Sequence, residues 1–87
     1  MSTIAPPAGP LTLKLKARRE LPSPAARRAL RTAAGVSQQD IASAVGVTRQ
    51  CVSWWESGER SPTGENLTRY VKVLDEIRRA VLAGAGA

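Results

Sequence analysis

The sequence predicts an all-α domain, a compact bundle of four to five helices with a flexible N-terminal arm and a long C-terminal helix. Residues that favour helix starts, serine and threonine, recur along the chain, and glycine follows most of the stretches that they open. Apolar side chains inside these stretches return every three or four residues, which is the helical period. The starts and stops are Ser23 and Gly35, Ser37 and Gly46, Thr48 and Gly58, and Thr63.

The chain has 87 residues, enough for one small domain, and a net charge of +6. Residues 1–31 hold seven of the 13 basic side chains and one of the seven acidic ones, so the remainder of the chain is electrically balanced. The excess positive charge in the N-terminal third indicates either a polyanionic partner or a solvated basic tail.

Several function classes find no support in the composition. Cys51 is the only cysteine and there is no histidine, so we expect no internal disulfide, no metal site and no other cofactor. Paired carboxylates and glycine-rich phosphate loops are missing as well, and we expect no catalytic residues. No apolar run approaches the roughly 20 residues of a membrane span, and no signal peptide is recognisable. We therefore expect a non-enzymatic protein in a reducing cytoplasm, without a membrane partner.

Residues 1–22 are predicted to be a flexible basic arm, because residues 1–10 contain three prolines and a glycine. Residues 11–16 alternate between apolar and polar side chains, which fits either a short strand or the beginning of a helix. Pro22 and Pro24 would end a helix arriving from upstream. The predicted domain then covers residues 23–83, and residues 84–87 form a tail.

Four helices are expected within this domain. Ser23 caps a helix over 24–34, with Pro24 in its first turn. Ser37 and Asp40 form a capping box at the start of a helix over 38–45. Thr48 caps a helix over 48–56, and Thr63 caps a long helix over 64–82.

The helices over 38–45 and 48–56 are joined by a very short link, which predicts a helix-turn-helix. Gly46 permits a sharp reversal because glycine adopts left-handed backbone angles at little cost. Val47 fills the elbow, and Ala42 is small enough to let the second helix approach closely. The apolar positions that face the partner helix are Ile41, Val45, Val52 and Trp55.

Such a unit leaves the start of its second helix facing outward, where side chains suited to DNA bases stand. Arg49 and Gln50 occupy the first turn, and Ser53 and Trp54 follow one turn later. Arginine matches the O6/N7 edge of guanine, and glutamine matches the N6/N7 edge of adenine. We expect these four residues to contact bases, although Arg49 and Gln50 are also compatible with a merely solvated face.

The stretch LRTAAGVSQQDIASAVGVTRQCVSWWESGERSP places these residues within a longer pattern, and residues 24–74 resemble the lambda-repressor-like, Xre-type helix-turn-helix family. The resemblance implies a bundle of four or five helices that binds double-stranded DNA, the operator. The positions that carry it are Ile41, Ala42, Val45, Gly46, Val47, Val52 and Trp55.

The resemblance also implies residue roles. Gln38 matches a glutamine that binds phosphate and steadies the first base-contacting residue. Arg31 and Glu56 match a pair that ties two helices together inside the fold. Trp54 stands where the family usually has a polar side chain, so its indole faces either a thymine methyl group or protein.

Further phosphate contacts are expected from positive or polar side chains around the predicted unit. Those near the unit are Gln38, Thr48 and Arg60, and those in the arm are Lys14, Lys16, Arg18 and Arg19. The arm residues lie either along phosphates or in the minor groove if the arm is ordered on DNA, and otherwise they remain disordered.

The helix over 64–82 has a heptad-like seam, made of Leu67, Tyr70, Leu74, Ile77 and Val81. The seam packs on its own domain, or its last two members, Ile77 and Val81, contact a second subunit in a homodimer. Two-fold dimers suit operators with half-sites about 34–36 Å apart.

These observations predict a sequence-specific transcription regulator of bacterial or phage type, a repressor or a Cro-like protein. Two other hypotheses stay open. One is an antitoxin-like or accessory protein-interaction module, and the other is an architectural factor in recombination.

Overall fold

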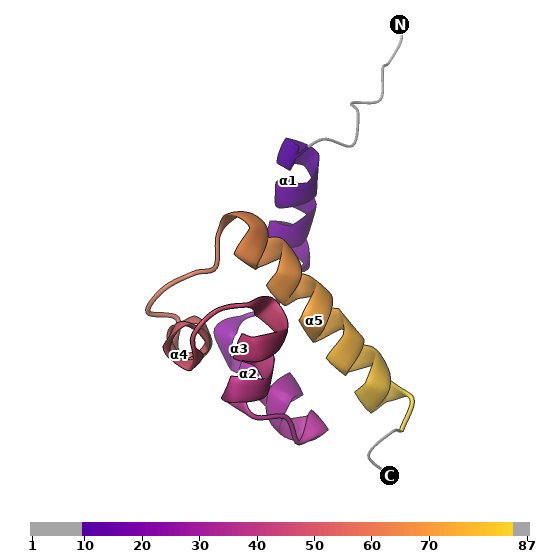
Figure 1. Cartoon of the computed structure of the whole chain (residues 1–87). Coiled ribbons are helices and arrows are strands. Elements are labelled where there is room, and N and C mark those ends of the chain that lie inside the picture. Colours follow the sequence, from indigo (N-terminus) through magenta and orange to yellow (C-terminus); the bar gives the residue numbers. More distant parts are fainter. Residues whose placement is uncertain (1–9, 85–87) are drawn as a thin grey trace, which may run out of the picture.

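The computed structural model describes residues 10–84 and contains five helices in this part of the chain (Figure 1). They are α1 (Pro10–Glu20), α2 (Pro24–Ala34), α3 (Gln38–Val45), α4 (Arg49–Ser57) and α5 (Gly64–Leu82). The predicted all-α fold is confirmed. The proposed tail at 84–87 lies, after Gly84, outside the described residues.

Local hydrogen bonds fix the ends of the central helices. The Ser23 hydroxyl accepts from the backbone N–H of Ala26 at 3.2 Å at the start of α2. Ser37 and Asp40 form the reciprocal capping box of α3, with both N···O distances at 3.0 Å. Thr63 occupies the expected N-cap position of α5, but its side chain makes no capping hydrogen bond.

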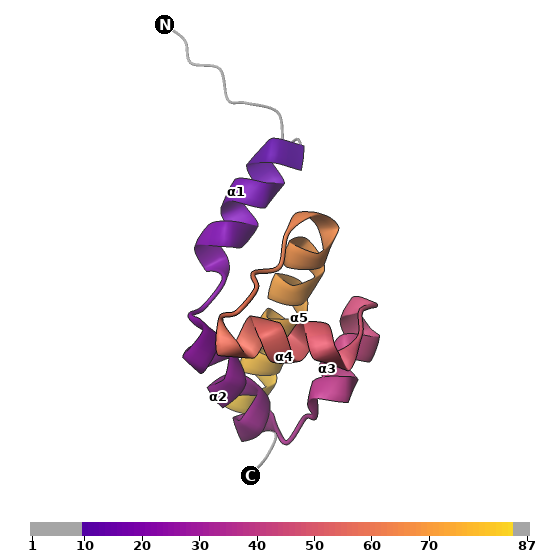
Figure 2. The same ribbon diagram turned by 90° about the vertical axis from the view of Figure 1, so that its left-hand side faces the viewer.

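The core lies where α5 crosses behind α4, with α3 beside them (Figure 2). Trp55 of α4 and Tyr70 of α5 meet there, with ring centroids 4.8 Å apart and planes tilted by 41°. Burial of such large rings supplies much of the hydrophobic stabilisation available to so small a domain. The other members of this buried cluster are Ile41, Ala42, Val45, Val52 and Leu74.

The seam of α5 faces this core over most of its length. Leu67, Tyr70 and Leu74 are buried, and Ile77 is half-buried and packs against the same cluster. Val81 is half-buried, and Leu82 beyond it is 75% exposed. Ile77 therefore serves its own domain, and the apolar surface left at this end of α5 comes mainly from Val81 and Leu82.

Residues 10–20 differ from the flexible arm that we expected over 1–22, because they form α1 and pack against α5. The alternation in 11–16 is thus part of a helix rather than a strand. Ala17 is 5% exposed and anchors α1 to the bundle, whereas Leu11 and Leu15 are exposed. Residues 1–9 of the proposed arm lie outside the described residues.

Candidate nucleic-acid interface

Helices α3 and α4 are joined by a tight turn at Gly46 and Val47. Gly46 has φ 91° and ψ 35°, left-handed angles that residues with a Cβ atom rarely adopt. The backbone N–H groups of Gly46 and Val47 both donate to the carbonyl of Ala42, at 2.8 and 2.9 Å. Val47 packs against the buried cluster, so the turn is fixed from inside the domain as well.

Helix α4 therefore begins on the outer surface of the domain (Figure 2). The Thr48 hydroxyl accepts from the Cys51 N–H at 3.2 Å and caps the helix. Arg49 and Gln50 in the first turn are exposed, and Ser53 one turn later is half-buried. The arrangement leaves polar side chains of the first two turns facing solvent while Val52 and Trp55 enter the core.

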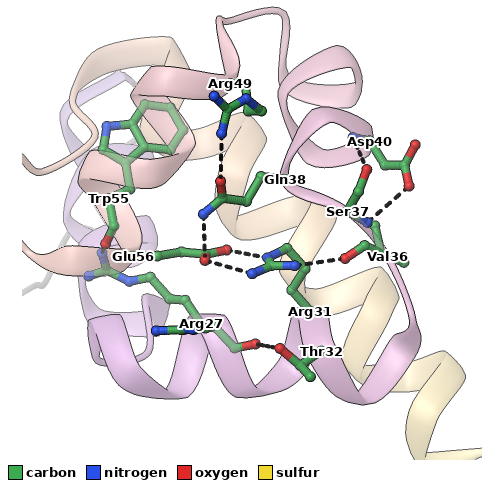
Figure 3. Close-up of polar contacts among 11 residues, drawn as sticks. Arg27, Arg31, Thr32, Val36, Ser37, Gln38, Asp40, Arg49, Trp55 and Glu56 are labelled. Atoms are coloured by element: carbon green, nitrogen blue, oxygen red, sulfur yellow. Dashed lines mark hydrogen bonds and ion pairs between the residues drawn. The ribbon is translucent and has the colours of Figure 1, made fainter.

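A chain of polar contacts connects this outer surface to the interior of the domain (Figure 3). The Nη1 of Arg49 donates to Oε1 of Gln38 at 3.4 Å, and Nε2 of Gln38 donates to Oε1 of Glu56 at 3.1 Å. Arg31 then holds both carboxylate oxygens of Glu56, through Nε at 2.6 Å and Nη2 at 3.0 Å. Gln38 thus lies between an anchored carboxylate and an exposed arginine.

Burial and charge act against each other at Glu56, whose side chain is only 5% exposed. Burial favours the neutral carboxyl, but the hydrogen bonds from Arg31 and Gln38 and the charge of Arg31 outweigh it and lower the pKa of Glu56. The hydrogen bond that Arg31 donates to Glu56 also raises the pKa of Arg31. Both side chains are therefore charged at neutral pH, as a forked ion pair requires.

Trp54 and Arg60 are brought together at the far end of α4. The Arg60 guanidinium carbon lies 4.0 Å from the centroid of the indole ring, which is a cation–π contact. Trp54 is half-buried and Arg60 is exposed. The indole therefore meets a side chain of its own protein while part of its surface stays open.

A small cleft of about 220 Å³ lies between α2 and the helix-turn-helix. Gln38 and Ser53 line it together with Arg28 and Ser57, which the sequence pattern did not single out. Arg28 is exposed and its charge contributes to the lowered pKa of Glu56. The cleft thus gathers polar groups from three helices beside the exposed face of α4.

Arg27 is a second residue that the sequence pattern did not single out. It is 7% exposed, and it donates from Nε to the Pro22 carbonyl and from Nη1 to the Trp55 carbonyl, both at 2.7 Å. Burial lowers the pKa of Arg27. One guanidinium thereby joins the link before α2 to the last turn of α4, where partial negative charge gathers at helix carbonyls.

The arm residues that were predicted to contact phosphate lie on α1, and not on the helix-turn-helix formed by α3 and α4. Arg18 is exposed, and Lys16 and Arg19 line a groove between α1 and α5. Lys14 belongs to α1, but its side chain lies outside the described residues. Figure 1 shows α1 rising from the end of the bundle at which α5 begins.

A short turn between two helices, with a polar outer face on the second, defines a helix-turn-helix DNA-binding protein. A family model described as "Helix-turn-helix" matches residues 28–82, and the chain belongs to this family, of the lambda-repressor-like type. Membership assigns binding of double-stranded DNA through α3 and α4. Comparisons with curated proteins and with solved structures give no match.

None of the described helices combines the length and the apolar character that crossing a bilayer demands.

Proposed function

We propose that the protein is a sequence-specific transcription regulator of bacterial or phage type, a repressor or a Cro-like protein, that reads the major groove with α4. The observation that carries this proposal is the exposed first turn of α4, anchored through Gln38 to the buried Glu56–Arg31 pair. An anchored arginine loses less side-chain entropy on meeting guanine than a free one does. Arg49, Gln50, Ser53 and Trp54 are the proposed base-contacting residues.

Phosphates are proposed to bind around this face. Gln38 and Thr48 stand at the starts of α3 and α4, where unpaired backbone N–H groups favour anions. Arg60 adds a positive charge held by the Trp54 ring. Lys14, Lys16, Arg18 and Arg19 would contact the flanking backbone along α1.

We propose further that two copies bind one operator, each occupying a half-site. The end of α5 supports this proposal, since Leu82 is 75% exposed and Val81 is half-buried. Because Ile77 already packs on its own domain, it adds at most its exposed part to such an interface. Sedimentation of the wild type and of Leu82→Glu, with Leu11→Glu as an exposed control, measures whether this end holds a dimer together.

Selection of bound sequences from random DNA tests the proposal directly. A defined motif that changes when Arg49 is replaced by Ala supports base contact by α4, and a palindrome supports the dimer. If selection returns no motif and DNA is merely bent, an architectural role replaces the proposal. Absence of any DNA shift together with a stoichiometric protein partner would favour an antitoxin-like module instead.

Salt dependence provides an independent measurement. If each domain neutralises about six to eight phosphates, log affinity falls against log salt with a slope near −0.9 per phosphate. A flat response contradicts the proposed phosphate contacts even where a sequence motif is found.

A further inference from the structure

A second concave surface lies on the domain, away from the helix-turn-helix. It is a groove of about 670 Å³ between α1, the link to α2 and the length of α5. None of its lining residues belongs to α3 or α4. Its volume is within the range of pockets that bind small ligands or short peptide segments.

The rim of this groove is strongly basic. Five cationic side chains line it, against two carboxylates. One of the carboxylates, Asp75, is already paired with Arg78 at 3.1 Å and with Arg79 at 3.0 Å. Among the described residues, the other three rim cations form no ion pair, and they are Lys16, Arg19 and Lys72.

The floor of the groove is apolar. Leu21, Leu30 and Val71 line it and are only half-buried, so each still exposes hydrocarbon to water. A ligand that covers them gains from removing this surface from solvent. The described lining contains no aromatic side chain on which a nucleobase would stack.

From this combination we propose that the groove binds an acidic amphipathic peptide segment of a partner protein. Carboxylates of the peptide pair with the rim cations, and its apolar side chains cover the half-buried floor, in the manner of a helix in a groove. A phosphate backbone matches the rim but has nothing to place against Leu30 and Val71. Because α3 and α4 take no part, the peptide leaves the proposed base-contacting face free, and it shares with DNA only Lys16 and Arg19, which are also proposed to contact phosphate.

The probe for the test is a short fluorescein-labelled helical peptide with leucines at i, i+4 and i+7 flanked by glutamates. Fluorescence anisotropy measures its binding to the full chain, and the same peptide with lysine for glutamate is the charge control. Lys72→Glu reverses one exposed rim charge. Arg69→Glu makes the same change on the same helix outside the groove.

We expect saturable binding of the acidic peptide, weakened roughly tenfold by Lys72→Glu and little changed by Arg69→Glu. Lys72→Glu should leave DNA affinity unchanged, because Lys72 is not among the proposed phosphate contacts. If both variants lose peptide affinity equally, the binding depends only on the net charge of the protein, and the proposal is overturned. A loss of DNA affinity in Lys72→Glu assigns the surface to nucleic acid and overturns it too, while the helix-turn-helix proposal still stands.

Discussion

Arg31 of α2 and Glu56 of α4 form a forked ion pair, with N···O distances of 2.6 and 3.0 Å. Arg31 also donates from Nη1 to the carbonyl of Val36 at 3.0 Å, just before α3. Because Gln38 of α3 donates to the same carboxylate, the pair joins three helices at one point. Buried pairs of this kind add little over apolar packing, but the loss of one partner leaves a charge without compensation.

Glu56→Ala is expected to destabilise the domain by about 3 kcal/mol, because Arg31 would stay largely buried without its carboxylate. For a domain of this size that corresponds to a melting temperature lower by roughly 12–24 °C. Thermal melts followed by circular dichroism measure the change. Glu76→Ala, the same substitution at an exposed position of α5, should leave the melt almost unchanged.

Acid should remove the same stabilisation in the wild type. The folded-state pKa of Glu56 lies below its ordinary value of 4.5, so its contribution is present above that pH and is lost as the pH falls through the folded value. Glu56→Gln has no titratable carboxyl group at this position. We therefore expect the stability difference between wild type and Glu56→Gln to shrink below pH 4.5, and a difference that stays constant there contradicts the assignment.

Tyr70→Phe is expected to leave stability unchanged or to raise it by up to about 1 kcal/mol. The Tyr70 hydroxyl is buried and has no hydrogen-bond partner among the described residues, so removing it ends a desolvation cost. Urea unfolding measures the difference. A clear loss of stability would show that the hydroxyl has a partner in solution.

The pH dependence of this variant gives a second measurement. Burial, with the charge of Glu56, raises the pKa of Tyr70 from 10 to about 12. The stability that this shift contributes is complete below pH 10 and is lost as the pH rises through 12. Tyr70→Phe should therefore lose less stability than the wild type over this interval.

Gln50→Ala is expected to relax sequence preference at one base pair. Loss of a bidentate contact to a base edge costs about 1–3 kcal/mol for the preferred base and little for the others. Competition binding with single-base variants of the selected operator measures the change. Equal weakening for every sequence contradicts base contact by Gln50.

Arg18→Ala is the matched contrast, because Arg18 is exposed on α1 and is proposed to meet phosphate. We expect Arg18→Ala to weaken binding to all DNA sequences alike. It should also reduce the slope of log affinity against log salt by about 0.9, the contribution of one phosphate. Unchanged affinity at low salt would remove α1 from the proposed interface.

Local signals were sufficient to predict most of the helices. Serine and threonine N-caps, a proline in the first turn and left-handed glycines act within a few residues, so Ser37, Asp40 and Gly46 mark the bounds of α3 directly. The long helix was predicted over 64–82 and is found at Gly64–Leu82.

For residues 11–16 the sequence predicts either a strand or the beginning of a helix, and does not decide between them. Leucine alternates there with threonine and lysine, which fits a strand, and no N-cap serine or threonine directly precedes the segment. Support for helix α1 comes from packing on α5, where Ala17 is buried. Such a contact joins segments about 50 residues apart in sequence, and periodicity within one segment carries no information about it.

The sequence predicts those features of the candidate site that follow from the short turn, and it does not predict those that depend on hydrogen bonds to backbone carbonyls. The outward placement of Arg49 and Gln50 follows from the short turn at Gly46. Arg27 carries no comparable signal, because its partners are the carbonyls of Pro22 and Trp55, which every residue type possesses. Sequence alone does not separate it from its neighbour Arg28, which is exposed.

Arg27, which is buried, and Arg31, which is half-buried, also decide which surface residues of this protein can be altered. Both arginines bind α4 from its inner side. Arg27 donates to the main-chain carbonyl of Trp55, and Arg31 pairs with Glu56, so neither contact uses a side chain of the outer surface. The orientation of α4 is therefore set independently of the exposed residues Arg49 and Gln50. Both can consequently be replaced on an unaltered scaffold, so a library randomised at these two positions alone tests whether they set the proposed operator preference.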